Sequence, residues 1–195
     1  MLTPILNLAA DAPAIPYAEL LPARGDLWVF GYGSLMWNPG FDFLTAEKAV
    51  LHGYHRAFCM YSERHRGTPK RPGLVLALDR GGSCHGIAYR VRRALAAEVL
   101  AYLWHREMPR YAYLPRCLPV TFRNEAAVSL TFIADRGKPN YAGRLAPEQA
   151  ARIIAGATGE RGSNREYLAS TVRHMDELGI RAAGIREILR HVERL

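Results

Sequence analysis

The chain contains few cysteines, and none of them stands in a recognisable pattern. Cys59, Cys84 and Cys117 are the three cysteines of its 195 residues, and no two of them form a C-x-x-C spacing. An odd, scattered set argues against both a disulfide framework and a zinc site. Unpaired cysteines are typical of proteins kept in a reducing compartment. The sequence therefore predicts a cytoplasmic location.

Long hydrophobic runs are also missing. No apolar stretch approaches the roughly 20 residues that a membrane-spanning helix requires, so we expect no membrane partner. Residues 1–26 are apolar and interrupted by prolines, but no basic residue precedes Arg24. A signal peptide begins with a positively charged region, which this segment lacks. We expect residues 1–26 to form a loosely held N-terminal extension over a single domain of residues 27–195.

Several catalytic and binding signatures are absent. The seven histidines include no H-E-x-x-H pattern and no i, i+4 pair with a carboxylate as third ligand, so no metal site is predicted. No Ser-His-Asp or Cys-His set is visible, although such a set can assemble in space. The net charge is +8, but the basic residues are dispersed and no nucleic-acid-binding motif accompanies them. A positive field attracts a small anionic substrate equally well, and we expect that kind of partner rather than nucleic acid. Nothing in the sequence indicates an obligatory protein partner.

The most informative segment that is present is a short apolar strand, Leu27 to Phe30, which ends in the run Gly31-Tyr32-Gly33-Ser34. Two glycines without Cβ atoms allow the backbone to turn sharply and to approach a ligand closely. Successive amide N–H groups in such a turn can hold a carboxylate or an oxyanion. The run therefore predicts a ligand-binding turn. The alternative is a structural strand end packed by Trp28, Tyr32 and Trp37.

Three familiar glycine motifs do not fit this run. A dinucleotide-binding fingerprint needs a third glycine where this chain has Met36. A nucleophile elbow has the pattern G-x-S-x-G, whereas Gly33 directly precedes Ser34 here. No Lys-Ser or Lys-Thr pair follows, as a phosphate-binding loop requires.

Apolar alternation and glycine or proline breaks predict the order of the remaining elements. A strand or bent pair is expected at 49–61, a polar loop at 64–73, strands at 74–78 and 85–91 joined by a tight turn at 79–82, a helix at 94–108, strands at 114–122 and 127–134, and helices at 147–155, 164–178 and 181–194. Ser163 or Asn164 is expected to cap the second of these last helices. The order excludes regular βαβ alternation. It favours an α+β domain with a curved, mostly antiparallel, barrel-like sheet and flanking helices.

A carboxylate occupies an unusual position on the helix predicted at 94–108. Leu95, Val99 and Leu103 form a buried stripe with a spacing of four, and Glu107 is the next residue on it. Its neighbour Arg106 is expected on another face. The helix dipole disfavours a negative charge in the last turn, and partial burial adds a desolvation cost, so both raise the pKa of the carboxyl group. Two interpretations follow: a buried ion pair with an arginine (Arg56, Arg106 or Arg116), or a general acid and base facing a cavity.

Several segments together resemble the ChaC family of γ-glutamylcyclotransferases. The matching pieces are Val29 to Phe41, Arg66 to Pro69 with Pro72-Gly73, Tyr102 to Met108, Asn140-Tyr141 and Gly162 to Leu168. They occur in the family's order and cover most of the chain. Two parts depart from the family pattern: residues 1–26 lie outside the match, and the segment Pro109 to Ala112 differs from the family's usual loop.

The resemblance implies the γ-glutamylcyclotransferase fold, with a curved mixed sheet and flanking helices. It also implies cofactor-free breakdown of glutathione to 5-oxoproline and cysteinylglycine. In that interpretation Glu107 is the catalytic acid and base, and Tyr167 lies at the substrate. The γ-glutamyl group would be bound by Phe30, Gly31, Tyr32, Gly33, Ser34 and Leu35. The alternatives are an enzyme of the same fold that acts on other γ-glutamyl amines or amino acids, and a non-catalytic protein that retains the binding pocket.

Overall fold

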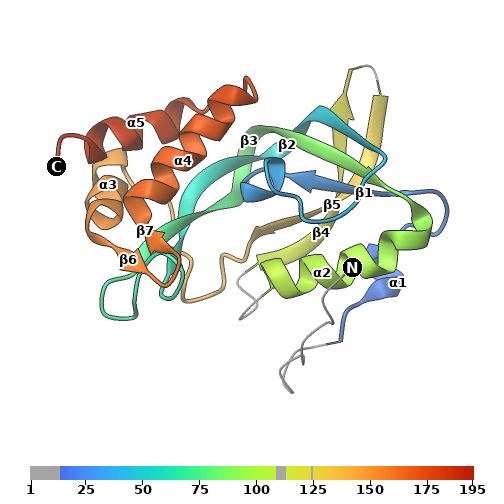
Figure 1. Ribbon diagram of the computed structural model, residues 1–195, viewed down its shortest axis with the longest axis horizontal. Coiled ribbons are helices and arrows are strands. Elements are labelled where there is room, and N and C mark those ends of the chain that lie inside the picture. The colour runs from blue at the N-terminus through green and yellow to red at the C-terminus, as the bar shows by residue number, and fades with distance from the viewer. Residues whose placement is uncertain (1–13, 109–112, 124) are drawn as a thin grey trace.

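The computed structural model describes residues 14–108, 113–123 and 125–195, and its centre is a closed barrel of five strands (Figure 1). The strands are β1 (Leu27–Gly31), β2 (Thr45–Ser62), β3 (Gly73–Val91), β4 (Tyr113–Phe122) and β5 (Glu125–Ala134). They are ordered β1-β3-β2-β4-β5, and the barrel closes where β5 pairs in parallel with β1 and β3. All other pairings in the barrel are antiparallel. The predicted α+β architecture with a barrel-like, mostly antiparallel sheet is confirmed.

The prediction of two strands joined by a tight turn at 79–82 is wrong. Residues 73–91 form the single long strand β3, which pairs with β2 along nearly its whole length. The register shifts between His52 and Tyr54, close to the glycines that suggested a turn. Gly53, Gly81 and Gly82 have positive φ angles there, so they bend a continuous hairpin instead of ending a strand. The two long strands therefore reach beyond the barrel and carry the C-terminal helices.

The helices lie at two places around this sheet (Figure 1). Helix α2 (Ala96–Glu107) follows a short 3₁₀ turn (Arg93–Leu95) and lies near α1 (Tyr17–Leu20). The C-terminal helices α3 (Pro147–Gly156), α4 (Asn164–Glu177) and α5 (Ala183–Val192) gather at the other end. Between α3 and α4 the chain forms a small hairpin, β6 (Thr158–Gly159) and β7 (Gly162–Ser163), which the sequence did not predict. Ser163 caps α4 as expected, since its hydroxyl accepts a hydrogen bond from the Glu166 amide at 3.1 Å.

Two large apolar cores and one smaller cluster, which includes Met60 and Ala77, are found among the described residues. One of the large cores lies inside the barrel and includes Phe30, Leu51 and Leu78. The larger one lies between the sheet and the helices and includes Leu103 of α2 and Leu168 of α4. Because the larger core has contributions from both groups of helices, the space between them is fixed by packing from both sides.

Part of the predicted N-terminal extension is packed against the domain. Leu20 belongs to the larger core. Asp26 pairs with Arg90 at 2.8 Å and accepts a hydrogen bond from the Arg93 amide at 3.0 Å. Residues 1–13 of the extension lie outside the described part of the chain. In the described part, no helix is both long and apolar enough to span a membrane.

A buried amide joins the C-terminal helices to the long hairpin. Asn164, fully buried at the start of α4, accepts from the Leu74 amide at 2.6 Å and donates to the Leu74 carbonyl at 2.8 Å. The side chain thus replaces a neighbouring strand at this residue of β3. Removing it would leave both polar groups of Leu74 buried without a partner.

We expect Asn164→Ala to lower the free energy of unfolding by about 2–4 kcal/mol, because two buried backbone groups lose their hydrogen bonds. Urea denaturation followed by circular dichroism measures this change. Arg173→Ala, an exposed substitution on the same helix, is the control and should change stability by less than about 0.5 kcal/mol. Equal stability of the two variants would contradict the role of Asn164.

Candidate active site

A cavity of about 660 Å³ lies where the turn after β1, the ends of β2 and β3, the end of α2, and α4 meet. Six of the residues predicted for the site line it: Tyr32, Gly33, Ser34, Leu35, Glu107 and Tyr167. Phe30 and Gly31 do not line the cavity. The ring of Phe30 is completely buried in the barrel core. The structure therefore brings the glycine turn and the helix carboxylate to one chamber.

The turn after β1 is a short 3₁₀ helix, Ser34–Met36. The first N–H groups of such a turn have no partner within it. Its carbonyl groups are occupied, because the Tyr89 hydroxyl lies 2.9 Å from the carbonyl oxygens of both Leu35 and Met36. Tyr89 of β3 therefore fixes the direction in which the carbonyl groups of the turn point.

A half-buried arginine on β2 supports the same turn. Arg56 donates from Nε to the Tyr32 carbonyl, and from Nη2 to the His85 carbonyl at 2.6 Å. The same Nη2 lies 3.6 Å from the Met36 sulfur. Burial lowers the pKa of this guanidinium, and the backbone carbonyls partly replace its lost hydration. Arg56 was considered as an ion-pair partner of Glu107, and instead it holds the backbone of the turn.

Glu107 ends helix α2, whose buried face includes Val99 and Leu103 as predicted. Its side chain is 19% exposed, and its Oε1 atom lies 3.2 Å from Nε of Arg106. Arg106 was one of the three arginines considered as an ion-pair partner of Glu107, and the structure confirms that pair. Its Cβ does start on a different face, but the long side chain reaches around the last turn of the helix to the carboxylate. Glu107 thus has an ion-pair partner and also faces the cavity.

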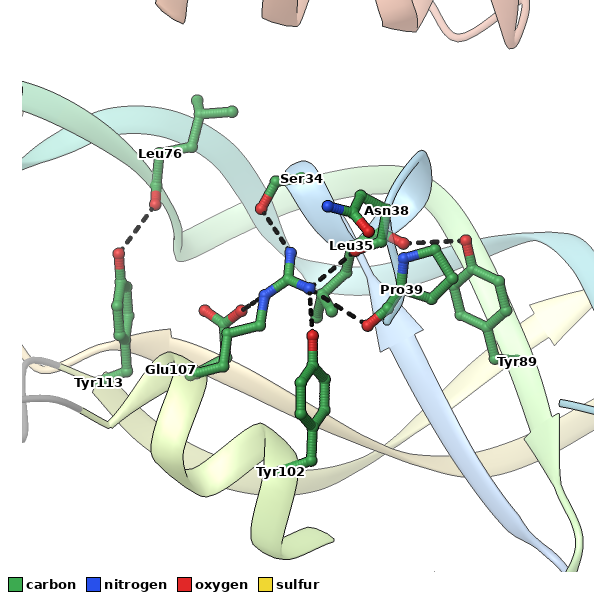
Figure 2. Close-up of polar contacts among 10 residues, drawn as sticks. Ser34, Leu35, Asn38, Pro39, Leu76, Tyr89, Tyr102, Glu107 and Tyr113 are labelled. Atoms are coloured by element: carbon green, nitrogen blue, oxygen red, sulfur yellow. Dashed lines mark hydrogen bonds and ion pairs between the residues drawn. The ribbon is translucent and has the colours of Figure 1, made fainter. Parts of the chain in front are cut away.

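The Arg106 guanidinium joins helix α2 to the turn after β1. Figure 2 labels its contact partners Ser34, Asn38 and Tyr102. The Nη2 atom of Arg106 donates to the Ser34 hydroxyl at 2.9 Å. Its Nη1 donates to the carbonyls of Asn38 at 2.7 Å and Pro39 at 3.2 Å, and to the Tyr102 hydroxyl at 2.9 Å. One planar group therefore fixes the turn relative to the helix that carries the carboxylate.

Burial raises the pKa of Glu107 above the ordinary value of a glutamate, while the positive charge of Arg106 and its hydrogen bond partly oppose that shift. The carboxylate is therefore more basic than one in water. A carboxyl group tuned upward can both accept and return a proton near neutral pH.

Three tyrosine side chains complete the wall beside Glu107. Tyr32, Tyr113 and Tyr167 all line the cavity. Burial is the main cause that raises the pKa of each phenol, to about 12 for Tyr167. These hydroxyls therefore remain protonated at physiological pH and can donate hydrogen bonds. The Tyr113 hydroxyl donates to the Leu76 carbonyl at 3.2 Å (Figure 2).

Several cavity residues were not singled out for the site from the sequence. They are Tyr113 of β4, the arginines Arg64, Arg66 and Arg161, and the helix residues Tyr102 and Arg106. Arg66 and Arg106 stand within the segments that resemble the ChaC family, so their position there was the available signal. The segment Pro109 to Ala112, expected to differ from the family loop, lies outside the described residues. Within the described ranges, no group of three or more His, Cys, Asp or Glu side chains could hold a metal ion.

The fold belongs to a known class of enzymes. A solved structure, a γ-glutamyl cyclotransferase specific to glutathione from yeast, matches with a TM-score of 0.79. The match covers 88% of this chain and 97% of that one at 22% sequence identity. The two proteins therefore share the γ-glutamylcyclotransferase fold, as the sequence resemblance implied.

Sequence comparison identifies the family. The model of the ChaC-like proteins matches residues 27–195. The glutathione-specific γ-glutamylcyclotransferase of Escherichia coli (strain K12) is 38% identical over 175 residues, covering 89% of this chain and 76% of the relative. The human glutathione-specific γ-glutamylcyclotransferase 1 is 34% identical over 177 residues, covering 86% and 79%. The chain belongs to the ChaC family.

Proposed function

We propose that this protein cleaves glutathione into 5-oxoproline and cysteinylglycine. The observation that carries the proposal is the single cavity shared by the Glu107 carboxylate and the turn Gly33 to Leu35. The activity named for the relatives in Escherichia coli and human supports the choice of substrate. We also propose a cytoplasmic location, which the three free cysteines support.

The reaction needs no nucleophile from the enzyme. The α-amino nitrogen of the γ-glutamyl group attacks the γ-carbonyl carbon of the same molecule and closes a five-membered ring. The bond from that carbon to the cysteine nitrogen then breaks, and cysteinylglycine leaves. Well-oriented intramolecular attack corresponds to effective molarities of about 10⁵–10⁸ M, so holding the folded conformer supplies much of the rate.

Glu107 would move the proton in both steps. As a carboxylate it accepts a proton from the α-ammonium group, which frees the nitrogen lone pair for attack. As a carboxylic acid it then donates that proton to the departing cysteine nitrogen. The second proton, which the attacking nitrogen loses when it becomes the ring amide, passes to the freed amine of cysteinylglycine or to water. Its raised pKa, caused mainly by burial, suits a group that must hold the proton between the two steps.

The turn after β1 would bind the other end of the γ-glutamyl group. The amides of Gly33, Ser34 and Leu35 would donate to the α-carboxylate, as the sequence led us to expect. Phe30 and Gly31 would act without touching the substrate, by anchoring the turn to the barrel. The phenols of Tyr32 and Tyr167 would donate hydrogen bonds within the cavity, where negative charge develops on the γ-carbonyl oxygen.

The direct test is to incubate the purified protein with glutathione and to quantify 5-oxoproline and cysteinylglycine. We expect the two products in equal amounts, without an added cofactor. A parallel assay with γ-glutamyl-alanine distinguishes the alternatives: preference for that substrate would indicate a different γ-glutamyl specificity. Binding of glutathione without turnover of either substrate would indicate a non-catalytic binding protein.

We expect Gly33→Ala to raise KM for glutathione by about three- to tenfold with a smaller change in kcat. Gly33 lines the cavity, and a Cβ there would lie 4.0 Å from its nearest neighbour, Leu76 Cδ1, so the fold tolerates the methyl group. The added methyl group would instead crowd the bound carboxylate, at a cost of about 1 kcal/mol. Steady-state kinetics measure the effect. An unchanged KM would contradict the role of this turn.

A further inference from the structure

A cluster of basic side chains lines the cavity away from the α2 helix. Arg64 and Arg66 follow β2, and Arg161 lies in the turn of the β6–β7 hairpin. These residues belong to two segments almost a hundred positions apart in the sequence. The described lining residues include four arginines and two glutamates, so positive charge predominates in the chamber. The reaction proposed above uses none of these three arginines.

The two segments are joined closely through their backbones. The Glu160 amide donates to the Arg64 carbonyl at 2.8 Å, and the Arg161 amide donates to the His65 carbonyl at 3.0 Å. Gly159 permits this approach, because a Cβ there would lie 2.4 Å from the Arg64 carbonyl oxygen. The positions of Arg66 and Arg161 relative to each other are therefore set by main-chain contacts.

The Arg66 guanidinium is held in place by three contacts. Its Nη1 atom donates to the Arg161 carbonyl and, at 3.4 Å, to the Ser163 carbonyl. Its central carbon lies 4.9 Å from the centre of the Tyr167 ring. No carboxylate of the described residues forms an ion pair with it, although Glu166 lies near enough to influence its charge. Arg66 is thus oriented by neutral groups, while its Nε and Nη2 atoms have no recorded acceptor among those residues.

The other two arginines differ in their pairing. Arg64 is neutralised at the surface by Glu160, at 2.7 Å. Arg161 is exposed, and its side chain has no recorded partner in the described part of the chain. Arg66 and Arg161 therefore provide the available positive charge at this end of the cavity.

Tyr167 shares the cavity with Glu107, and its ring lies against the Arg66 guanidinium. Apart from burial and a hydrogen bond from the Leu76 backbone, the positive charge of Arg66 and the negative charge of Glu107 both influence the pKa of its phenol. Arg66 therefore lies against the ring, and Glu107 is within electrostatic range of the phenol. A substrate with its scissile amide at Glu107 would extend across Tyr167 toward Arg66.

We propose that Arg66, assisted by Arg161, binds the carboxylate of the C-terminal glycine of glutathione. This inference depends on the proposed function and adds a determinant of specificity to it. A guanidinium held by neutral groups can form a charge-assisted, bidentate pair with a carboxylate. A γ-glutamyl dipeptide is one residue shorter, so its own terminal carboxylate would lie nearer Tyr167 and could not form this pair in the same way. The contact would favour the tripeptide.

The test compares glutathione with its C-terminal amide, in which the glycine carboxylate is replaced by an uncharged carboxamide. We expect the wild-type protein to prefer glutathione by about 10- to 50-fold in kcat/KM, mainly through KM, because hydrogen bonds to charged groups contribute about that much. Arg66→Met should lower kcat/KM for glutathione by a similar factor and leave that for the amide nearly unchanged. Arg66→Lys should restore part of the preference.

Two further variants make the result decisive. Arg161→Met removes an exposed side chain without recorded contacts, so its fold should be intact, and it should reduce the preference by a smaller factor. Arg152→Met, on an exposed position of α3 outside the cavity, is the matched control and should keep the wild-type preference.

The possible failures can be distinguished. If wild-type protein turns over glutathione but does not distinguish it from the amide, this inference is overturned and the proposed function stands. If Arg66→Met slows both substrates equally, Arg66 either supports the fold or binds the α-carboxylate, and the inference is also overturned. Absence of any turnover by the wild-type protein overturns the proposed function, and the inference with it.

Discussion

Replacing Glu107 by glutamine is expected to lower kcat for glutathione by roughly 10³–10⁴-fold, while KM changes little. The amide keeps the shape of the side chain but cannot accept the proton of the α-ammonium group or return it to the leaving nitrogen. Proton transfer by a positioned side chain contributes about 10²–10⁴-fold, and the same carboxylate is proposed to act in both steps. Release of 5-oxoproline under saturating glutathione measures the loss.

The substitution should leave the fold intact, because it removes a largely buried charge and keeps the volume. Arg106 retains its contacts with Ser34 and the backbone of the turn. Glu98→Gln, on the exposed face of the same helix, is the matched control and should keep wild-type turnover. Calorimetry of glutathione binding to the Glu107→Gln variant distinguishes loss of the chemical step from loss of the binding site. A variant that retained more than a tenth of wild-type kcat would remove Glu107 from the mechanism.

Replacing Arg106 by methionine is expected to lower kcat/KM for glutathione by about 100- to 1000-fold and to change its pH dependence. The loss follows from the hydrogen bonds that the guanidinium makes to Ser34 and to the turn backbone, since bonds to a charged group contribute about 1.5–3 kcal/mol each. The pH effect follows from the ion pair with Glu107.

The direction of the pH effect is determined by the base role of Glu107. Activity requires the carboxylate form, so kcat/KM falls as pH decreases through the pKa of Glu107 in the folded protein. Burial raises that pKa and Arg106 lowers it. Without the arginine the pKa rises further, so the acid limb of the profile should move to higher pH.

Lysine at position 106 provides the comparison. Arg106→Lys keeps the positive charge but loses the planar fork, so it should reduce kcat/KM while the acid limb stays near that of the wild-type protein. Measuring kcat/KM from acid to neutral pH for both variants tests the argument. An acid limb at the same pH in the methionine variant and the wild-type protein would show that Arg106 does not control the proton affinity of Glu107.

The sequence correctly predicted the elements whose patterns involve only residues close together in the chain. The alternation in β4 and β5, the four-residue spacing in α2 and the Ser163 cap of α4 each depend on near neighbours, and each is present. The continuous strand β3 was missed because its glycines at 81 and 82 have the composition of a turn. Because β3 pairs with β2 on both sides of these glycines, they bend the strand and do not end it.

The sequence predicted those site residues whose own position in the sequence is unusual. Glu107 was found because a carboxylate on an apolar stripe conflicts with its surroundings. Arg106 was one of three arginines considered as the partner of that carboxylate, and the sequence could not choose among them, because helix geometry fixes Cβ directions and not the end of a long side chain. The contributions of Arg56, Tyr113 and Arg161 depend on strands and turns that meet only in the folded chain, and no spacing in the sequence contains that information.

The walls of the cavity come from stretches as distant as Tyr32 and Tyr167, and the Asn164 tether joins residues 90 positions apart. Contacts between such remote segments close large loops and form slowly. A chain that has completed only its barrel and α2 would already hold the turn and Glu107, yet it would lack one side of the chamber. From the topology we expect the chamber to be completed late in folding, so that incompletely folded molecules would lack a finished binding site.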